Sequence, residues 1–283
     1  MSFFDRMSTG WTMSMKCFSV LRKNKQLIVF PLLSTLSLIV VAFSFIAFLL
    51  VPNGWDVEQA VDRANPMYWV AAFLFYLVNY FIIIFFNMAL VHCVRLYFQG
   101  GNPTVGAGLS FSMSRLGVIF GWASVAATVG LFFKMLQEGG GKVGEIVAAI
   151  LGIVWSIMTF FVIPVIAYEN VGPIAAIKRS SSIMKEKWGE SVTASFSFGL
   201  VQLLGFFCLV VPLFLIGAMI NVVAGIVLGV VGLFILGSII SAAQTIFISA
   251  IYHKLNNEPA PDFNDQTIDG LFMKKESNGF FGK

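Results

Sequence analysis

The chain has 283 residues, of which 58% are hydrophobic and 11% charged, and it carries a net charge of +4. Globular domains average about a quarter charged residues, so this composition, with several apolar runs of about 20 residues, excludes an ordinary soluble domain and predicts a bilayer-embedded chain. The positive charge is too small and too dispersed for a nucleic-acid partner. It lies beside apolar runs, where anionic lipid headgroups are the expected partners.

The first 26 residues predict an amphipathic helix that lies on the membrane surface. Apolar residues recur at every third or fourth position, and polar residues occupy the other faces. Lys16 lies within this segment, and Arg22 and Lys23 lie near its end. We refer to such a short surface helix before a membrane span as an elbow.

Six apolar runs follow, and each is long enough to cross a bilayer. They cover residues 27–51, 67–91, 116–133, 146–168, 192–216 and 223–252. Pro164 and Pro212 are expected to interrupt the fourth and fifth runs, and the loop around Gly140 is expected to be flexible. We therefore expect an all-α, polytopic membrane helix bundle with six transmembrane helices, forming one domain over 1–252 and followed by a polar tail over 253–283.

Two further elbows are expected before the third and fifth spans, at 102–115 and 172–190. Pro103 and Pro173 open them, and proline suits the first turn of a helix because its missing N–H would be unpaired there. Gly189 is expected to end the second of these elbows. The apolar stripe predicted for that elbow consists of Ile174, Ile177, Met184 and Trp188.

The distribution of Lys and Arg predicts the orientation. Fifteen of the 18 fall in the N-terminal stretch, in alternate links and in the tail, whereas Arg63, Lys134 and Lys142 occupy the opposite loops. Because cytoplasmic loops carry the excess of positive residues, both termini, the three elbows and the tail are predicted to be cytoplasmic.

The sequence predicts no enzyme, no cofactor and no metal site. His92 and His253 lie at span ends and belong to no metal-spaced cluster. Cys17, Cys93 and Cys208 are far apart and form no CxxC pair, so three free thiols are expected. The segment GGGKV lacks the Ser or Thr that would complete a P-loop.

The best functional candidates are Glu169 and the basic residues of the elbows. Glu169 follows the fourth span and is expected to pair with Arg179 or Lys178, which would fix the elbow to the bundle. The cations either set topology and anchor the elbows, or bind phospholipid headgroups or a protein partner. The complete set of headgroup or partner candidates is Lys16, Arg22, Lys23, Glu169, Lys178, Arg179, Lys185, Lys187 and Trp188.

The candidate polar residues inside the spans are four amides and one threonine, and the spans contain no Asp, Glu, Lys or Arg. This pattern argues against a proton-coupled pump, because such pumps use ionisable groups within the membrane. The amides either bond helices together or line a polar cavity. These candidates are Asn79, Asn87, Gln202, Gln244 and Thr245. Two GxxxG pairs, Gly117/Gly121 and Gly225/Gly229, are expected to form internal packing faces.

Several stretches resemble a known family. FFDRMSTGW, SVLRKNKQLIVFPLLS, WSIMTFFVIPVIAYENVGPIAAIKRSSSIMKEKWGE and the closing PAPDF and LFMKK are similar to a widespread prokaryotic family of six-span integral membrane proteins of unknown function. That family is distantly similar to the membrane domain that accompanies some glycerophosphodiesterases. The resemblance implies a multi-pass protein of the prokaryotic inner or plasma membrane and supplies no catalytic residues.

Two functional hypotheses follow from these observations. The first is a non-catalytic integral membrane component that acts in envelope organisation or as the membrane subunit of a larger assembly. Its expected partners are anionic membrane lipids and a cytosolic or membrane protein, or a second copy of the chain. The alternative is a transporter or lipid-handling carrier for weakly polar or lipidic substrates, since interrupted helices often line substrate sites.

Overall fold

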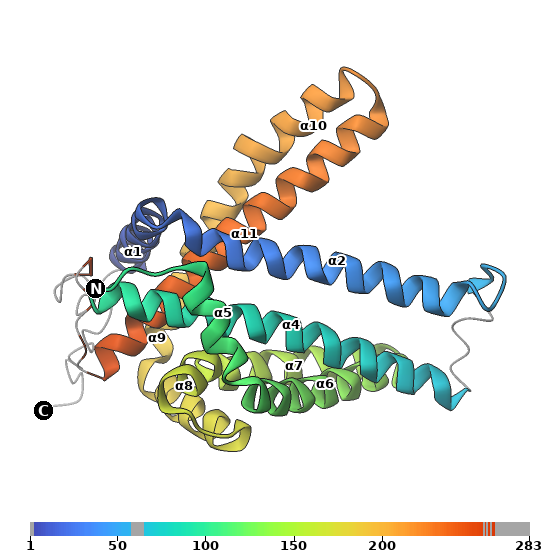
Figure 1. The fold of residues 1–283 in the computed structure, drawn as a ribbon, viewed down its shortest axis with the longest axis horizontal. Coiled ribbons are helices and arrows are strands. Elements are labelled where there is room, and N and C mark those ends of the chain that lie inside the picture. Colours follow the sequence, from blue (N-terminus) through green and yellow to red (C-terminus); the bar gives the residue numbers. More distant parts are fainter. Residues whose placement is uncertain (1–2, 58–64, 257, 259, 261, 264–283) are drawn as a thin grey trace, which may run out of the picture. The chain divides into compact units, whose positions relative to one another are not determined.

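The computed structural model describes residues 3–57, 65–256, 258, 260, 262 and 263, with residues 3–9 and 186–197 described as backbone only. All regular secondary structure in these residues is helical. Six helical segments are long and apolar enough to cross a membrane, as in a multi-pass membrane protein. The prediction of an all-α chain with six spans is thus confirmed (Figure 1).

The elements agree closely with the predicted runs. In chain order they are α1 (Phe3–Lys23), the 3-10 turn η1 (Lys25–Ile28), α2 (Val29–Leu50), α4 (Pro66–Phe98), α5 (Val105–Met113), α6 (Leu116–Gly139), α7 (Gly141–Thr159), α8 (Val162–Glu169), α9 (Pro173–Gly205), the π-turn η2 (Phe206–Val210), α10 (Val211–Ala218) and α11 (Val222–Leu255). The six candidate spans are Lys25–Leu50, Pro66–Phe98, Leu116–Gly139, Gly141–Glu169, Phe198–Ala218 and Val222–Leu255.

The chain divides into two compact units, each built around one long helix. The α4 unit comprises Lys25–Met184, and in it α4 packs against α2, α5, α6 and α8, while α7 packs against α6. The α11 unit comprises Met1–Asn24 and Lys185–Lys283, and in it α11 packs against α1, η2 and α10. Helix α9 contributes its first turns to the α4 unit and its remainder to the α11 unit.

The large buried side chains of both central helices lie toward their C-terminal ends. On α4 they include Met88, Leu90 and Phe98, and on α11 they include Phe247 and Tyr252. The N-terminal half of α11 buries mainly glycines, which allow α10 to approach closely. Each central helix is therefore most deeply buried at the end where polar residues begin.

The α10–α11 hairpin confirms one of the two predicted glycine packing faces. A Cβ on Gly225 would lie 3.0 Å from atoms of α10, and a Cβ on Gly229 would lie 3.4 Å from Phe214. By contrast, Gly117 faces open space and Gly121 only meets Pro173, at 3.4 Å. The second pair therefore packs two helices together, as expected, and Gly117 contributes nothing to such packing.

Helix α9 differs from the prediction of a separate elbow over 172–190. It begins at Pro173 as expected, but it continues to Gly205 without ending at Gly189. One glycine inside a helix destabilises it by only about 1 kcal/mol, which a 33-residue helix readily offsets. The elbow and the start of the fifth span are therefore one helix. The segment 102–115 does contain a separate short helix, α5, whose N-cap Thr104 accepts a hydrogen bond from the Ala107 N–H at 3.1 Å.

Both predicted proline interruptions are confirmed. In the fourth span α7 ends at Thr159 and α8 starts at Val162, with Pro164 in its first turn. Proline there lacks an N–H and would clash with the carbonyl group four residues earlier. In the fifth span the π-turn η2 comes immediately before α10, which contains Pro212 near its start.

The glycine-rich link between α6 and α7 forms a tight turn, whereas the sequence predicts a flexible loop. The Gly140 N–H donates to Leu136 O at 3.1 Å, and the Gly144 N–H donates to Gly140 O at 2.9 Å. A Cβ on Gly144 would collide with the Leu136 carbonyl oxygen. Glycines thus permit a close reversal between two helices, and Gly141, at φ +52°, adopts the left-handed conformation that glycine favours.

Candidate functional site

The C-terminal end of α4 carries His92 and Arg95, and both lie against aromatic rings of neighbouring helices. The His92 ring stacks on Phe111 of α5 with centroids 4.0 Å apart and an interplanar angle of 4°. The Arg95 guanidinium carbon lies 4.5 Å from the centroid of the Tyr168 ring on α8. A guanidinium over an aromatic face is attracted by the electron-rich ring.

Arg115 joins the same region from the start of α6. Its guanidinium carbon lies 5.0 Å from the Phe111 ring centroid, and its Nη1 donates a hydrogen bond to Asn170 Oδ1. Asn170 ends α8 in the left-handed conformation, at φ 52°, which asparagine tolerates better than most residues. We call His92, Arg95, Phe111, Arg115 and Tyr168 the cation–aromatic cluster.

Two further bonds attach the first turns of α9 to this end of the α4 unit. Arg179 Nε donates to Glu169 Oε1 at 3.1 Å, so the predicted pairing of Glu169 with Arg179 is confirmed. The next residue, the buried Ser180, accepts a hydrogen bond through its Oγ from the Phe161 N–H at 3.0 Å. Phe161 lies at the break between α7 and α8, where a backbone donor has lost its helical partner.

The cluster has the chemistry of an anion site. Its two guanidinium groups are planar donors suited to phosphate or carboxylate. Arg95 Nε is buried and has no hydrogen-bond acceptor among the described residues. Within the described part of the chain, no three His, Cys, Asp or Glu side chains gather as metal ligands would.

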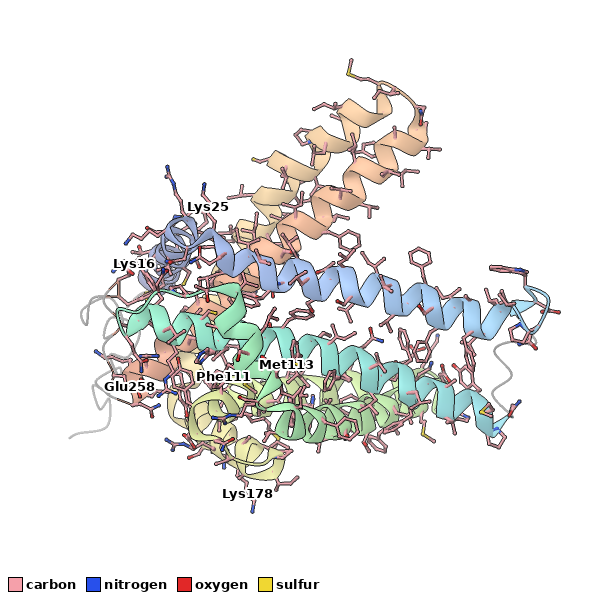
Figure 2. All side chains as sticks on the ribbon, viewed as in Figure 1. Lys16, Lys25, Phe111, Met113, Lys178 and Glu258 are labelled. Atoms are coloured by element: carbon pink, nitrogen blue, oxygen red, sulfur yellow. The ribbon has the colours of Figure 1, made fainter. Side chains whose placement is uncertain are left out.

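The other predicted cations are distributed over both units. Lys178 is exposed on α9 and points away from the α4 unit (Figure 2). In the α11 unit, Arg22, Lys23 and Lys185 are exposed and Lys16 is half-buried. The side chains of Lys187 and Trp188 lie outside the described residues. Within this set, the structure shows Glu169 in contact with Arg179, and the headgroup-binding role of the set stays a prediction.

The described tail residues return to the α11 unit. Lys23 Nζ forms an ion pair with Asp262 Oδ1 at 2.6 Å, and the fully buried His253 has its Nδ1 3.4 Å from Glu258 Oε2. Phe263 is buried as well. This part of the predicted cytoplasmic tail is thus attached to its own unit, and α11 itself extends to Leu255, beyond the expected end of the sixth span.

The predicted intramembrane polar residues are divided between the two units. Asn79 and Asn87 are half-buried on α4, and the Asn79 amide donates to Phe75 O at 2.6 Å within its own helix. In the α11 unit, Gln202 and Gln244 are exposed, and Thr245 donates to Ser241 O at 2.9 Å. Their roles as helix-bonding or cavity-lining groups stay predictions.

A half-enclosed cavity of about 190 Å³ lies within the α4 unit, and none of those polar residues lines it. Its walls come from α2 and α4, and Lys134 of α6 is its one charged lining residue among those the structure describes.

Sequence reasoning missed the cation–aromatic cluster and this cavity. His92 and Arg95 were visible only as polar residues at a span end. Their ring partners lie up to 73 positions away in the sequence. The one available signal was the presence of an arginine at the end of the second span and another at the start of the third.

Comparison with known families gives one match. Residues 66–260 match the family described as "Family of unknown function (DUF6159)". No curated protein matches the chain. The expected resemblance to a family of unknown function is confirmed to that extent, whereas the prokaryotic distribution and the distant similarity to the glycerophosphodiesterase-associated domain stay predictions.

Proposed function

Because the chain belongs to the family of unknown function DUF6159, which carries no assigned activity, we propose a function from the geometry of the chain itself. We propose a non-catalytic integral protein of the prokaryotic inner or plasma membrane, with both termini cytoplasmic. It acts in envelope organisation or as the membrane subunit of a larger assembly. The excess of Lys and Arg on one predicted side supports this orientation.

The observation that carries the proposal is the way the first turns of α9 are held. The Ser180 hydrogen bond and the Glu169–Arg179 ion pair attach these turns to the rest of the α4 unit. On their outer surface, Ile174 is 60% exposed and Lys178 is exposed as well. An apolar side chain near a cation suits the boundary between acyl chains and anionic headgroups. It equally suits a protein partner that covers the apolar residue.

The polar groups of this region also support a structural role over a catalytic one. Arg115 bonds Asn170, and Glu169 bonds Arg179, so these groups join helix ends to one another. Arg95 and Arg115 further offer guanidinium groups to an anionic headgroup. We infer that this end of the α4 unit is the cytoplasmic platform to which anionic lipids or a protein partner bind.

The proposal is tested by extracting the chain with its surrounding lipid into polymer nanodiscs and weighing the particles. We expect particles heavier than one 31.1 kDa chain plus lipid, and we expect Ile174→Glu with Lys178→Glu to release the additional mass. Lys142→Glu, at another exposed lysine, is the matched control. A single chain in every preparation, with anionic lipid retained equally by both variants, would contradict the proposal.

The second candidate, a transporter or lipid-handling carrier for weakly polar or lipidic substrates, is favoured by the cavity of the α4 unit. Because its lining is almost wholly apolar, it favours a lipidic substrate over a polar one. Reconstituted liposomes decide between the two functions. Movement of a defined lipid or solute by the purified chain would replace the first proposal with the second.

A further inference from the structure

The cavity of the α4 unit is formed where two antiparallel stretches of helix face each other. Residues 42–49 of α2 run past residues 68–75 of α4, and the wall includes the three small residues Ala42, Ala71 and Ala72. Their methyl groups leave space that larger side chains would fill. The rings of Phe45 and Phe75 meet edge to face at 5.3 Å and form part of the wall.

The polar end of this cavity lies at the ends of the helices that form it. Lys134 Nζ lies 5.1 Å from the centroid of the Tyr68 ring, and Tyr68 is in the first turn of α4. The opposite stretch of α2 there is close to its last residue, Leu50. From this level the cavity extends along the helices toward Phe75, and Tyr68 and Lys134 are the polar residues among its described lining residues.

Lys134 is held so that it faces the cavity. Glu138, one turn further along α6, lies 4.0 Å from Lys134 Nζ and does not line the cavity. The carboxylate therefore neutralises part of the lysine charge from outside.

From these contacts we propose that the cavity binds the acyl chain of a fatty acid, with the carboxylate of the ligand at Lys134. The volume sets the size of the ligand. An apolar cavity of about 150 Å³ takes up benzene, so about 190 Å³ holds a segment of one acyl chain and has no room for two side by side. Ile46, 49% exposed, lines the cavity, so its open side lies on the apolar surface that the spans present to lipid.

The proposed fatty-acid site is the same cavity that favours the second candidate function, but the site requires only binding and no transport. A binding measurement therefore separates the two: a chain that binds without moving lipid supports the site and rejects the carrier. The first proposed function, at the opposite end of α4, is independent of either result.

The experiment measures radiolabelled oleate binding to the purified full chain in nanodiscs of neutral phosphatidylcholine. We expect saturable binding that Ala71→Leu weakens at least tenfold, because the added carbons occupy the cavity. Val70→Leu is the matched control, since Val70 is the preceding residue on α4 and is 52% exposed. If Ala71→Leu does not fold, Ala42→Leu fills the same cavity from α2.

The charge is tested separately. Lys134→Gln should weaken oleate binding about three- to fivefold, the equivalent of a partly exposed ion pair, and should leave binding of the neutral oleyl alcohol unchanged. Lys142→Gln, at an exposed lysine outside the cavity, should change neither. Folded filling variants that bind oleate like the wild type, an equal loss with Val70→Leu, or equal loss of both ligands in Lys134→Gln would overturn the proposal.

Discussion

Replacing Ser180 with alanine should destabilise the fold, because the backbone N–H of Phe161 would lose its hydrogen-bond acceptor. The Ser180 hydroxyl accepts the Phe161 N–H at 3.0 Å, and both residues are fully buried. Phe161 stands at the break between α7 and α8, so this hydrogen bond replaces a helical one. In Ser180→Ala the donor stays buried, and neither the new side chain nor surrounding lipid offers an acceptor.

The magnitude follows from the burial. A buried donor left without a partner costs about 1–3 kcal/mol, whereas hydrogen bonds between membrane helices average nearer 0.6 kcal/mol because the unfolded state in the membrane also finds partners. Complete burial of both groups favours the higher range. We expect Ser180→Ala to lower the free energy of unfolding by about 1–2 kcal/mol.

The assay is equilibrium unfolding in mixed micelles, followed by tryptophan fluorescence. Trp122 and Trp155 report on the same unit, since their rings stack with centroids 5.8 Å apart. Ser182→Ala is the control, because Ser182 is exposed on the same helix and should change stability by less than about 0.5 kcal/mol. Equal stability of the two variants would refute the argument that Ser180 supports the break in the fourth span.

Three further outcomes are expected. Gly108→Ala should destabilise the fold by about 1–3 kcal/mol in thermal unfolding, because the new Cβ would lie 2.6–2.9 Å from its three nearest atoms. The control Gly106→Ala places its Cβ in open space and should be tolerated, so equal melting temperatures of the two variants would contradict this prediction. The Glu169–Arg179 pair, with side chains 31% and 48% exposed, should contribute no more than about 1 kcal/mol in a double-mutant cycle. A coupling energy above about 2 kcal/mol would show that the exposure of the two side chains does not limit the strength of this ion pair. Burial raises the pKa of the Cys17 thiol, so at about pH 8 alkylation, read by peptide mass spectrometry, should modify Cys17 only after unfolding; rapid native labelling would show that the thiol is accessible.

The spans could be predicted from the sequence because each is a local property of a continuous apolar run. The interruptions at Pro164 and Pro212 were equally local, since proline lacks the N–H that a helix needs. The tight α6–α7 turn could not be predicted, because glycines such as Gly140 and Gly144 are equally compatible with a flexible loop and with close packing. Only the position of the Leu136 carbonyl group in the structure decides between the two. Likewise, Gly189 is a residue type that often follows the end of a helix, but the stability of the whole of α9 exceeds the cost of one internal glycine.

The candidate sites required distances that no local pattern contains. Glu169 and Arg179 are close in sequence and opposite in charge, so their pairing was predictable and is confirmed. Arg95 and Tyr168 meet only because α8 packs against α4. The cavity arises from three alanines on two helices, and alanine in an apolar run carries no signal of which neighbour it faces.

The lengths of α4 and α11 have a consequence for how the protein responds to its bilayer. Their 33 and 34 residues correspond to about 50 Å at 1.5 Å per residue, against about 30 Å of hydrocarbon. A helix with such a surplus ordinarily tilts to relieve hydrophobic mismatch. Here the C-terminal turns are buried by protein, through α5 and α8 around α4 and through α1 beside α11. Because those turns are fixed by protein contacts, changes in bilayer thickness should be absorbed at the N-terminal halves, which bury fewer large side chains, and the orientation of each helix within its own unit should stay constant.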